Sequence, residues 1–233
     1  MPVLPSFVKD VIHLFFPHHC AGCGSDIIAN DHFLCIDCMS RLPYTGYEKI
    51  PGNPVENIFT GRTTVEAASS AFYFSKGHLV QQLIHQLKYK GNKEAGEYLG
   101  LLTGKALLAS GRFSQVDYLV PLPLYPDKEF RRGYNQAAVI CHGISSILHV
   151  PVHSNNVIRK RATETQTKKH RTERWENVEG SFLVRHPEQL AGKKILLVDD
   201  VITTGATLEA CAQVIVAIPG VTLSICTLAV AGK

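Results

Sequence analysis

Two neighbouring carboxylates and a set of hydroxyl side chains follow a run of four apolar residues. Asp199 and Asp200 come directly after Ile195–Val198 and lead into Thr203, Thr204, Gly205, Ala206 and Thr207. Four consecutive apolar residues are typical of a strand buried on both faces of a parallel sheet. A loop that leads from such a strand into a helix offers free N–H groups and the positive end of a helix dipole, which suits a phosphate. We therefore expect an anion at this turn.

The two carboxylates narrow the type of ligand, because they would repel a phosphate that carries no other group. Asp199 and Asp200 suit a ligand that also carries hydroxyl groups, such as a ribose diol, or a bound Mg²⁺. Gly205 lets the backbone approach an anion closely. A plain strand, turn and helix cap is the alternative, and it is the better interpretation of a lone Asp-Asp pair. The turn is not a Walker P-loop, since no Gly-Lys-Ser/Thr follows the glycine.

Four cysteines near the N-terminus have the spacing of a zinc site. They form two Cys-x-x-Cys pairs with eleven residues between them: Cys20, Cys23, Cys35 and Cys38. Four thiolates complete a tetrahedral Zn²⁺ and leave no open position, so we predict a structural zinc and not a catalytic one. Two disulfides or redox pairs are the alternatives. A reduced compartment argues against the first, and the lack of a following βαβ pattern argues against the second.

Positive charge is concentrated in one segment of the chain. The net charge is +4, but residues 159–174 alone carry +5. This local excess indicates an anionic ligand. Residues 159–178 show no clear periodicity, and a long irregular stretch inside a compact domain is usually a functional lid or a disordered segment. The basic side chains of interest in it are Arg161, Lys168, Lys169 and Arg171.

The elements that must position these groups alternate between strands and helices. We expect strands at 67–74, 117–123, 150–158, 181–184, 195–198 and 222–230, and helices at 78–89, 93–109, 137–148 and 208–218. This order predicts an α/β fold with a parallel sheet flanked by helices. The acids and the Thr-rich turn then lie at the carboxyl ends of the strands, where open α/β sheets bind ligands.

Two further basic clusters stand at the ends of predicted elements. The loop 125–135 contains Arg131, Arg132, Gly133 and Asn135, a combination that suits a pyrophosphate, although a solvated turn is the alternative. Lys88 and Lys90 end the helix predicted at 78–89. We interpret these two lysines as complements to the helix dipole.

The length of 233 residues and the hydrophobic content of 45% predict one medium domain with a small appendage. We expect an N-terminal helix and zinc module over 1–45, a linker rich in proline and glycine over 46–64, and the main domain over 65–233. No apolar run is long enough for a membrane span. The N-terminus lacks a basic n-region and a small-residue cleavage site, so we expect a cytoplasmic, reduced protein.

The order of elements over residues 65–233 resembles the core of type I phosphoribosyltransferases. Within that class, nearly the whole chain resembles the ComF family, which is associated with DNA uptake in bacterial competence. The motifs that carry this closer resemblance are the two cysteine pairs, Leu87–Gly91, Val120–Pro123, Arg131–Gln136, Arg161 with Thr163 and Gln166, Arg171, Asn177 and the Asp-Asp turn.

This resemblance implies roles for the candidate site residues toward 5-phosphoribosyl-1-pyrophosphate (PRPP) with Mg²⁺. Asp199 and Asp200 would accept the ribose hydroxyls, and residues 203–207 would hold the 5-phosphate. Because successive strand side chains point to opposite faces, both acids reach the sugar only if the strand ends at Asp199. Residues 131–135 would face the pyrophosphate, and a basic loop would close over the site. The loop residues are Arg161, Lys168, Lys169 and Arg171, and the implied catalytic set is Asp199, Asp200, Arg131 and Lys168.

Two functions remain open at this point. The first is a PRPP-binding module that handles single-stranded DNA during competence, with a partner such as a DNA helicase or translocase. Aromatic residues for base stacking near the basic run are sparse, with Trp175 and Tyr134 as the candidates. The second is an active, Mg²⁺-dependent phosphoribosyltransferase that acts on an unidentified base or amine, since the sequence contains no stretch that identifies an acceptor.

Overall fold

The chain divides into two compact units, Met1–Leu42 and Pro43–Lys233. The computed structural model describes residues 19–26, 32–75, 78–160 and 181–231. In the first unit, the described residues contain both cysteine pairs and the short helix α2 (Ile36–Ser40). The Sγ of Cys35 accepts the Cys38 N–H at the start of this helix.

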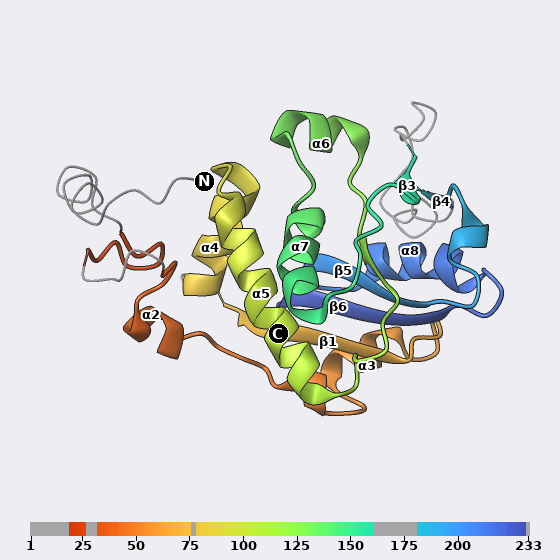
Figure 1. Cartoon of the computed structure of the whole chain (residues 1–233), viewed down its shortest axis with the longest axis horizontal. Coiled ribbons are helices and arrows are strands. Elements are labelled where there is room, and N and C mark those ends of the chain that lie inside the picture. Colours follow the sequence, from red (N-terminus) through yellow and green to blue (C-terminus); the bar gives the residue numbers. More distant parts are fainter. Residues whose placement is uncertain (1–18, 27–31, 76–77, 161–180, 232–233) are drawn as a thin grey trace, which may run out of the picture. The chain divides into compact units, whose positions relative to one another are not determined.

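A parallel four-stranded sheet forms the centre of the second unit, as predicted for an α/β fold (Figure 1). The strand order is β1-β6-β5-β2. The strands are β1 (Ala67–Phe74), β2 (Tyr118–Pro121), β5 (Lys194–Ile202) and β6 (Thr222–Ala231). A separate antiparallel pair joins β3 (Val157–Arg159) to β4 (Phe182–Val184). Of the strand predicted at 150–158, the structure contains β3 and a parallel bridge from Val152 to Leu119.

Helices cover both faces of this sheet. Figure 1 shows α4, α5 and α7 side by side, and α7 packs against β2 and β5. Ile195 and Leu197 share a buried apolar cluster with residues of α3 and α8. Leu196 and Val198 alternate with them and therefore face the side of α7. The helices are α3 (Pro54–Phe59), α4 (Leu79–Tyr89), α5 (Lys93–Ser110), α7 (Gln136–Leu148) and α8 (Ala206–Val216), with 3₁₀ turns η1 (Tyr47–Lys49) and η4 (Pro187–Gln189).

Residues 46–64, predicted to be a linker, are part of the second unit and pack on its sheet. Asn53 caps α3 by accepting the N–H groups of Val55 and Glu56, and it donates to the Ala68 carbonyl of β1. Val55 and Phe59 are fully buried. The prolines and glycines that suggested a linker occur in short packed turns. Pro54 occupies the first turn of α3, and Gly46 precedes η1 as its cap residue.

The basic loop predicted over 125–135 contains a further helix, α6 (Pro126–Arg132). Pro126 stands in its first turn, Asp127 and Glu129 complement the positive end of its dipole, and Gly133 closes it with a φ of 79°. These are ordinary helix signals in the sequence. The strand β5 also runs longer than expected and ends at Ile202, beyond both acids.

No helix in the described part of the chain is long and apolar enough to cross a membrane.

Candidate functional site

The turn between β5 and α8 forms a small pocket at the carboxyl edge of the sheet. The pocket has a volume of about 70 Å³ and is lined by Asp199 and residues 201–208. This is roughly twice the volume that a water molecule occupies in the liquid, so it suits one phosphate group and not a whole nucleotide. The first N–H groups of α8 have no acceptor within the helix, and they begin in this turn. The predicted residues Thr203, Thr204, Gly205, Ala206 and Thr207 all lie here.

Gly205 is required in this turn for two reasons. Its φ of 76° lies in the left-handed region, and a Cβ at this position would lie 2.5 Å from Cγ2 of Ile58. The turn is also held by Arg62, which donates to the Thr204 carbonyl at 3.3 Å and pairs with Glu209 of α8 at 3.4 Å. Segment 54–62, which contains Ile58 and Arg62, therefore supports the turn between β5 and α8.

The two acids point in different directions, which corrects the expectation that β5 ends at Asp199. Because the strand continues to Ile202, the two side chains project to opposite faces of the sheet. Asp199 lines the pocket beside the turn. Asp200 is buried on the other face, where its Oδ2 lies 2.8 Å from Nζ of Lys88. The end of α4 therefore contributes to the site, although the sequence pattern suggested only a dipole role for Lys88.

The electrostatics of the pair favour a single negative charge near neutral pH. Burial and the neighbouring charge of Asp200 raise the pKa of Asp199 to about 8, against the opposing effects of the Asp200 N–H, Lys88 and Arg159. The Asp200 N–H donates to Oδ1 of Asp199 at 2.8 Å. A donor or a cation placed beside Asp199 would favour its ionised form.

Several of the residues predicted to face a pyrophosphate also have contacts within the fold. Asn135 is buried at the start of α7, where it accepts the Ala137 N–H at 2.9 Å and donates to the Leu122 carbonyl at 3.0 Å. Gly133 ends α6, and the guanidinium of Arg132 lies 5.7 Å from the ring of Tyr89. Of this set, Arg131 is an exposed side chain on α6. The loop residues Arg161, Lys168, Lys169 and Arg171 lie outside the described residues.

A larger pocket of about 550 Å³ opens where β2 leads into α6 and α7. Its lining includes Pro123 and Leu124, which follow Pro121, and Pro121 is in register with Val198 of β5. Arg159 also lines it, with its guanidinium 3.9 Å from the ring of Tyr125. The buried Nε of Arg159 has no hydrogen-bond partner among the described residues. The basic segment thus begins with a fixed, unsatisfied donor that sequence periodicity could not identify.

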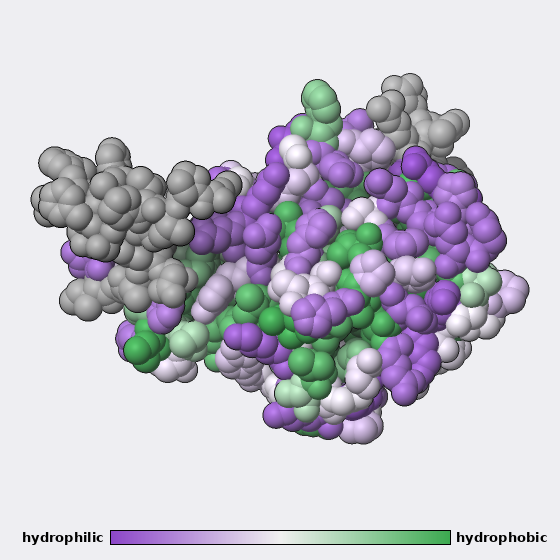
Figure 2. Space-filling model, viewed as in Figure 1, coloured by the Kyte–Doolittle hydropathy of each residue, from purple (hydrophilic) through white to green (hydrophobic). Residues whose placement is uncertain are grey.

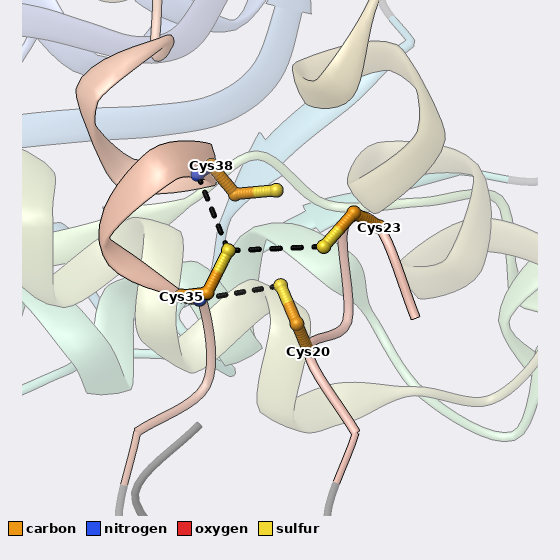
Figure 3. Close-up of side chains that lie close together, drawn as sticks. All are labelled: Cys20, Cys23, Cys35 and Cys38. Carbon is orange, nitrogen blue, oxygen red and sulfur yellow. Dashed lines mark hydrogen bonds between the residues drawn. The ribbon is translucent and has the colours of Figure 1, made fainter. Parts of the chain in front are cut away.

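The four predicted cysteines come together in the first unit (Figure 3). Their sulfur atoms all lie within 4.8 Å of one another, and Sγ of Cys23 lies 3.7 Å from Sγ of Cys35. Four sulfurs bound to one Zn²⁺ at about 2.3 Å are separated by about 3.8 Å, whereas a disulfide requires about 2.05 Å. The arrangement therefore fits zinc and not disulfides, and all four cysteines are free.

The chemistry of the cluster also suits a cation. Burial alone would raise the pKa of Cys20. The N–H groups of Cys23, Cys35 and Gly22 outweigh this effect and lower the pKa to about 6. Burial and its bonds to the other cysteines raise the pKa of Cys38 well above its ordinary value. Four thiolates at these distances repel one another unless a metal ion neutralises them. This is the only group of three or more metal-binding side chains in the part of the chain that the structure describes.

Comparison with known proteins agrees with this geometry. Residues 135–232 match the phosphoribosyl transferase domain. The chain is 35% identical over 136 residues to the DNA utilization protein YhgH of Escherichia coli, a match that covers 57% of this chain and 59% of that protein. The match therefore spans less than two thirds of that relative's length.

Two relatives match over more of the chain. Competence protein F of Haemophilus influenzae is 28% identical over 207 residues, covering 84% of this chain and 89% of that protein. Competence protein ComFC of Bacillus subtilis is 29% identical over 205 residues, covering 80% and 79%. Residues 135–232 therefore match a phosphoribosyl transferase domain, and the chain is similar over most of its length to the competence proteins F and ComFC.

Proposed function

We propose that this chain is a PRPP-binding protein of natural competence that handles single-stranded DNA in the cytoplasm. The observation that supports it most directly is the turn after β5, where a phosphate-sized pocket, the start of α8 and Asp199 meet. The phosphoribosyl transferase domain and the names of the competence relatives support the same assignment. Seven free cysteines are consistent with a reducing compartment.

In this proposal the turn binds the 5-phosphate, and the acids hold the ribose. Amides at the start of α8 and the hydroxyls of residues 203–207 donate to the phosphate. Asp199 accepts a ribose hydroxyl from within the pocket. Asp200 approaches from the α4 side, because a ligand in this fold rests across the carboxyl ends of the strands. By resemblance, Arg131 and the loop residues Arg161, Lys168, Lys169 and Arg171 meet the pyrophosphate.

In this proposal Mg²⁺ binds together with PRPP. The described residues contain no cluster of three carboxylate or histidine ligands that would hold it in advance. Mg²⁺ is typically bound by substrate phosphates together with one or two protein oxygens. When bound, the ion neutralises the pyrophosphate charge, which is the chemistry that a departing pyrophosphate requires.

For the first unit we propose a structural zinc bound by Cys20, Cys23, Cys35 and Cys38. The sulfur distances support it, and a four-thiolate site leaves no position for a substrate.

Exposed aromatic side chains near basic ones support the DNA part of the proposal. Phe130 of α6 is 90% exposed and directly precedes Arg131 and Arg132, and Tyr89 is 70% exposed beside Arg132. Figure 2 shows an apolar projection over α6 amid hydrophilic surface. Such aromatic side chains stack on bases while the cations contact phosphates. Tyr134, the stacking candidate from the sequence, is engaged instead, because its hydroxyl donates to the Leu87 carbonyl.

An active transferase is the second candidate, and the 550 Å³ pocket favours it. This pocket is large enough for a base or an amine acceptor, and its lining includes the loop that follows β2. The two candidates differ in one product, since only a transferase releases pyrophosphate when an acceptor is present.

Calorimetry with Mg²⁺ and PRPP tests the shared part of the proposal. We expect binding by the wild-type chain and at least tenfold weaker binding after Asp199→Asn with Asp200→Asn, because both hydroxyl acceptors lose their charge. Unchanged affinity would refute the site. A pyrophosphate-release assay with a panel of bases, amines and DNA then separates the binding module from the transferase.

Fluorescence anisotropy with a labelled oligothymidylate tests the DNA part. We expect salt-sensitive binding that Phe130→Ala weakens several-fold, since stacking contributes about 1–3 kcal/mol per base. Leu108→Ala removes another exposed apolar side chain, 52% exposed on α5, and should leave binding unchanged. The paired change Lys168→Glu with Lys169→Glu tests the basic loop. Absence of binding at low salt would leave only a role with a protein partner, such as a DNA helicase or translocase.

A further inference from the structure

The last turn of α4 brings a cation to one of the two site acids. Lys88 Nζ lies 2.8 Å from Asp200 Oδ2, and the two side chains are only 24% and 11% exposed. An ion pair removed from solvent in this way is not an ordinary surface contact, because exposed pairs leave both groups largely hydrated. Lys88 belongs to the Leu87–Gly91 motif, to which the proposed function so far assigns no role.

The position of Lys88 is fixed from both sides. Leu87 is fully buried, and its carbonyl accepts the Tyr134 hydroxyl. The ring of Tyr89 lies against the guanidinium of Arg132. Residues that follow β2 thus hold the residues before and after Lys88. The part of the chain expected to meet the pyrophosphate therefore supports the lysine that meets Asp200.

Asp200 needs such a partner if it is to act on a ligand. It is 8% exposed, and a buried carboxylate without a paired cation is costly. The Lys88 ammonium pairs with Oδ2 and fixes the position of that oxygen. Among the described residues, no hydrogen bond is recorded to the other oxygen, Oδ1, which leaves it as an acceptor at the carboxyl edge of the sheet.

We infer that Lys88 is a positioning residue of the sugar site: it holds Asp200 as an oriented carboxylate so that the free oxygen can accept a ribose hydroxyl. The inference rests on the proposed binding of PRPP and deepens it. It assigns a function to the end of α4, a region that lies outside the matched phosphoribosyl transferase domain at 135–232.

Calorimetry of Mg²⁺ and PRPP with three single variants tests the inference. Lys88→Met keeps the length of the side chain but removes its charge, and we expect affinity to fall at least tenfold. Lys88→Arg keeps the charge and should restore affinity to within about threefold of the wild type. Lys90→Met is the matched control, because it removes the same charge from an exposed position two residues along and should change affinity less than twofold.

A double-mutant cycle distinguishes positioning from a general effect of charge. In an Asp200→Asn background, Lys88→Met should cause no further loss of affinity, because its partner is already gone. Thermal unfolding of each variant shows that it is folded, and if Lys88→Met does not fold, Tyr134→Phe replaces it with an expected smaller loss. Equal affinity of Lys88→Met and the wild type would overturn the inference while PRPP binding stands. No binding by the wild type would instead refute the proposed function itself.

Discussion

The protonation of Asp199 links the candidate site to the stability of the fold. In the folded chain desolvation and the charge of Asp200 raise the pKa of this half-buried carboxyl to about 8, whereas an aspartate in an unfolded chain titrates near pH 4. Between these values the folded state binds more protons than the unfolded state. Stability contributed by this group is therefore greatest below about pH 4 and falls as the pH rises toward 8.

Asp199→Asn should remove this dependence. The variant should have a higher free energy of unfolding than the wild type. This difference should grow by at least about 1 kcal/mol between pH 5 and pH 8. Urea unfolding at several pH values measures it. Glu66→Gln, which changes an exposed acid, serves as the control and should show a constant difference. A parallel pH dependence of Asp199→Asn and the wild type would show that the carboxyl is ionised throughout.

Gly205 offers a second test at a single position. Gly61 and Gly205 have similar positive φ angles of 73° and 76°, but a Cβ at Gly61 meets no atom within 4 Å, whereas one at Gly205 would lie 2.5 Å from Ile58 Cγ2. Gly61→Ala should therefore cost only the strain of the backbone, about 1 kcal/mol. Gly205→Ala should cost at least about 2 kcal/mol, since overpacking adds to the strain.

Denaturant unfolding of both glycine variants compares the two costs. Adding Ile58→Ala to Gly205→Ala removes the clashing methyl group, so this pair of changes should cost less stability than the sum of the two changes made separately. If the two single variants lose equal stability, Ile58 does not restrict this turn.

Residues in one continuous motif were predictable, whereas residues brought together by the fold were not. Asp199, Gly205 and the threonines follow one strand, so their type and spacing predicted the pocket that contains them. Lys88 and Arg159 are distant in sequence from the turn, and their neighbours give no sign of a buried partner or an unsatisfied donor. Asn135 has a role that the motif did not reveal, because an amide suited to a ligand is equally suited to cap a helix.

The contact between α5 and α7 depends on glycines. A Cβ at Gly143 would lie 2.2 Å from the Glu97 carbonyl oxygen, and one at Gly100 would lie 2.3 Å from the Ile140 carbonyl oxygen. Glycine within a helix normally costs about 1 kcal/mol relative to alanine, so Gly→Ala would stabilise an unpacked helix. At these two positions the backbones are too close for a methyl group, and the sign should reverse.

We expect Gly100→Ala and Gly143→Ala each to lower the free energy of unfolding by about 2 kcal/mol or more, as overpacked cores do. Thermal and urea unfolding measure this. Gly96→Ala should cost less, because its Cβ would meet the flexible end of Leu87 at 2.8 Å and not a backbone atom. A stabilising effect at Gly143 would mean that the two helices can move apart.

Long periodic elements were predicted well, and short ones were not. The strand at 67–74 was predicted at its observed bounds, and the helices at 78–89 and 93–109 within one residue. The helices α3 and α6 have only six and seven residues, too few to show a period. Pro54 was interpreted as a linker signal, although proline is also favoured in the first turn of a helix. The support that α3 gives to the site therefore became visible only in the structure.

The two units of the chain differ in what stabilises them. The second unit has an extensive apolar core around β5 and β6. Among the described residues of the first unit, the buried side chains are Cys20, Phe33, Leu34, Cys38 and Leu42, and the helix α2 has five residues. These described residues bury little apolar surface, so we expect the proposed zinc to contribute much of the stability of the first unit.

Removal of zinc should therefore unfold the first unit and spare the second. Hydrogen exchange of the full chain, before and after treatment with a zinc chelator, should show loss of protection at residues 19–42 and unchanged protection in β5 and β6. Cys38→Ser should reproduce the loss without a chelator, because a three-thiolate site binds zinc more weakly. Cys226→Ser, a change in the fully packed strand β6, is the control and should retain protection at 19–42. Loss of protection throughout β5 and β6 on chelation would show instead that both units depend on the metal, and that the division after Leu42 does not separate two independently stable parts.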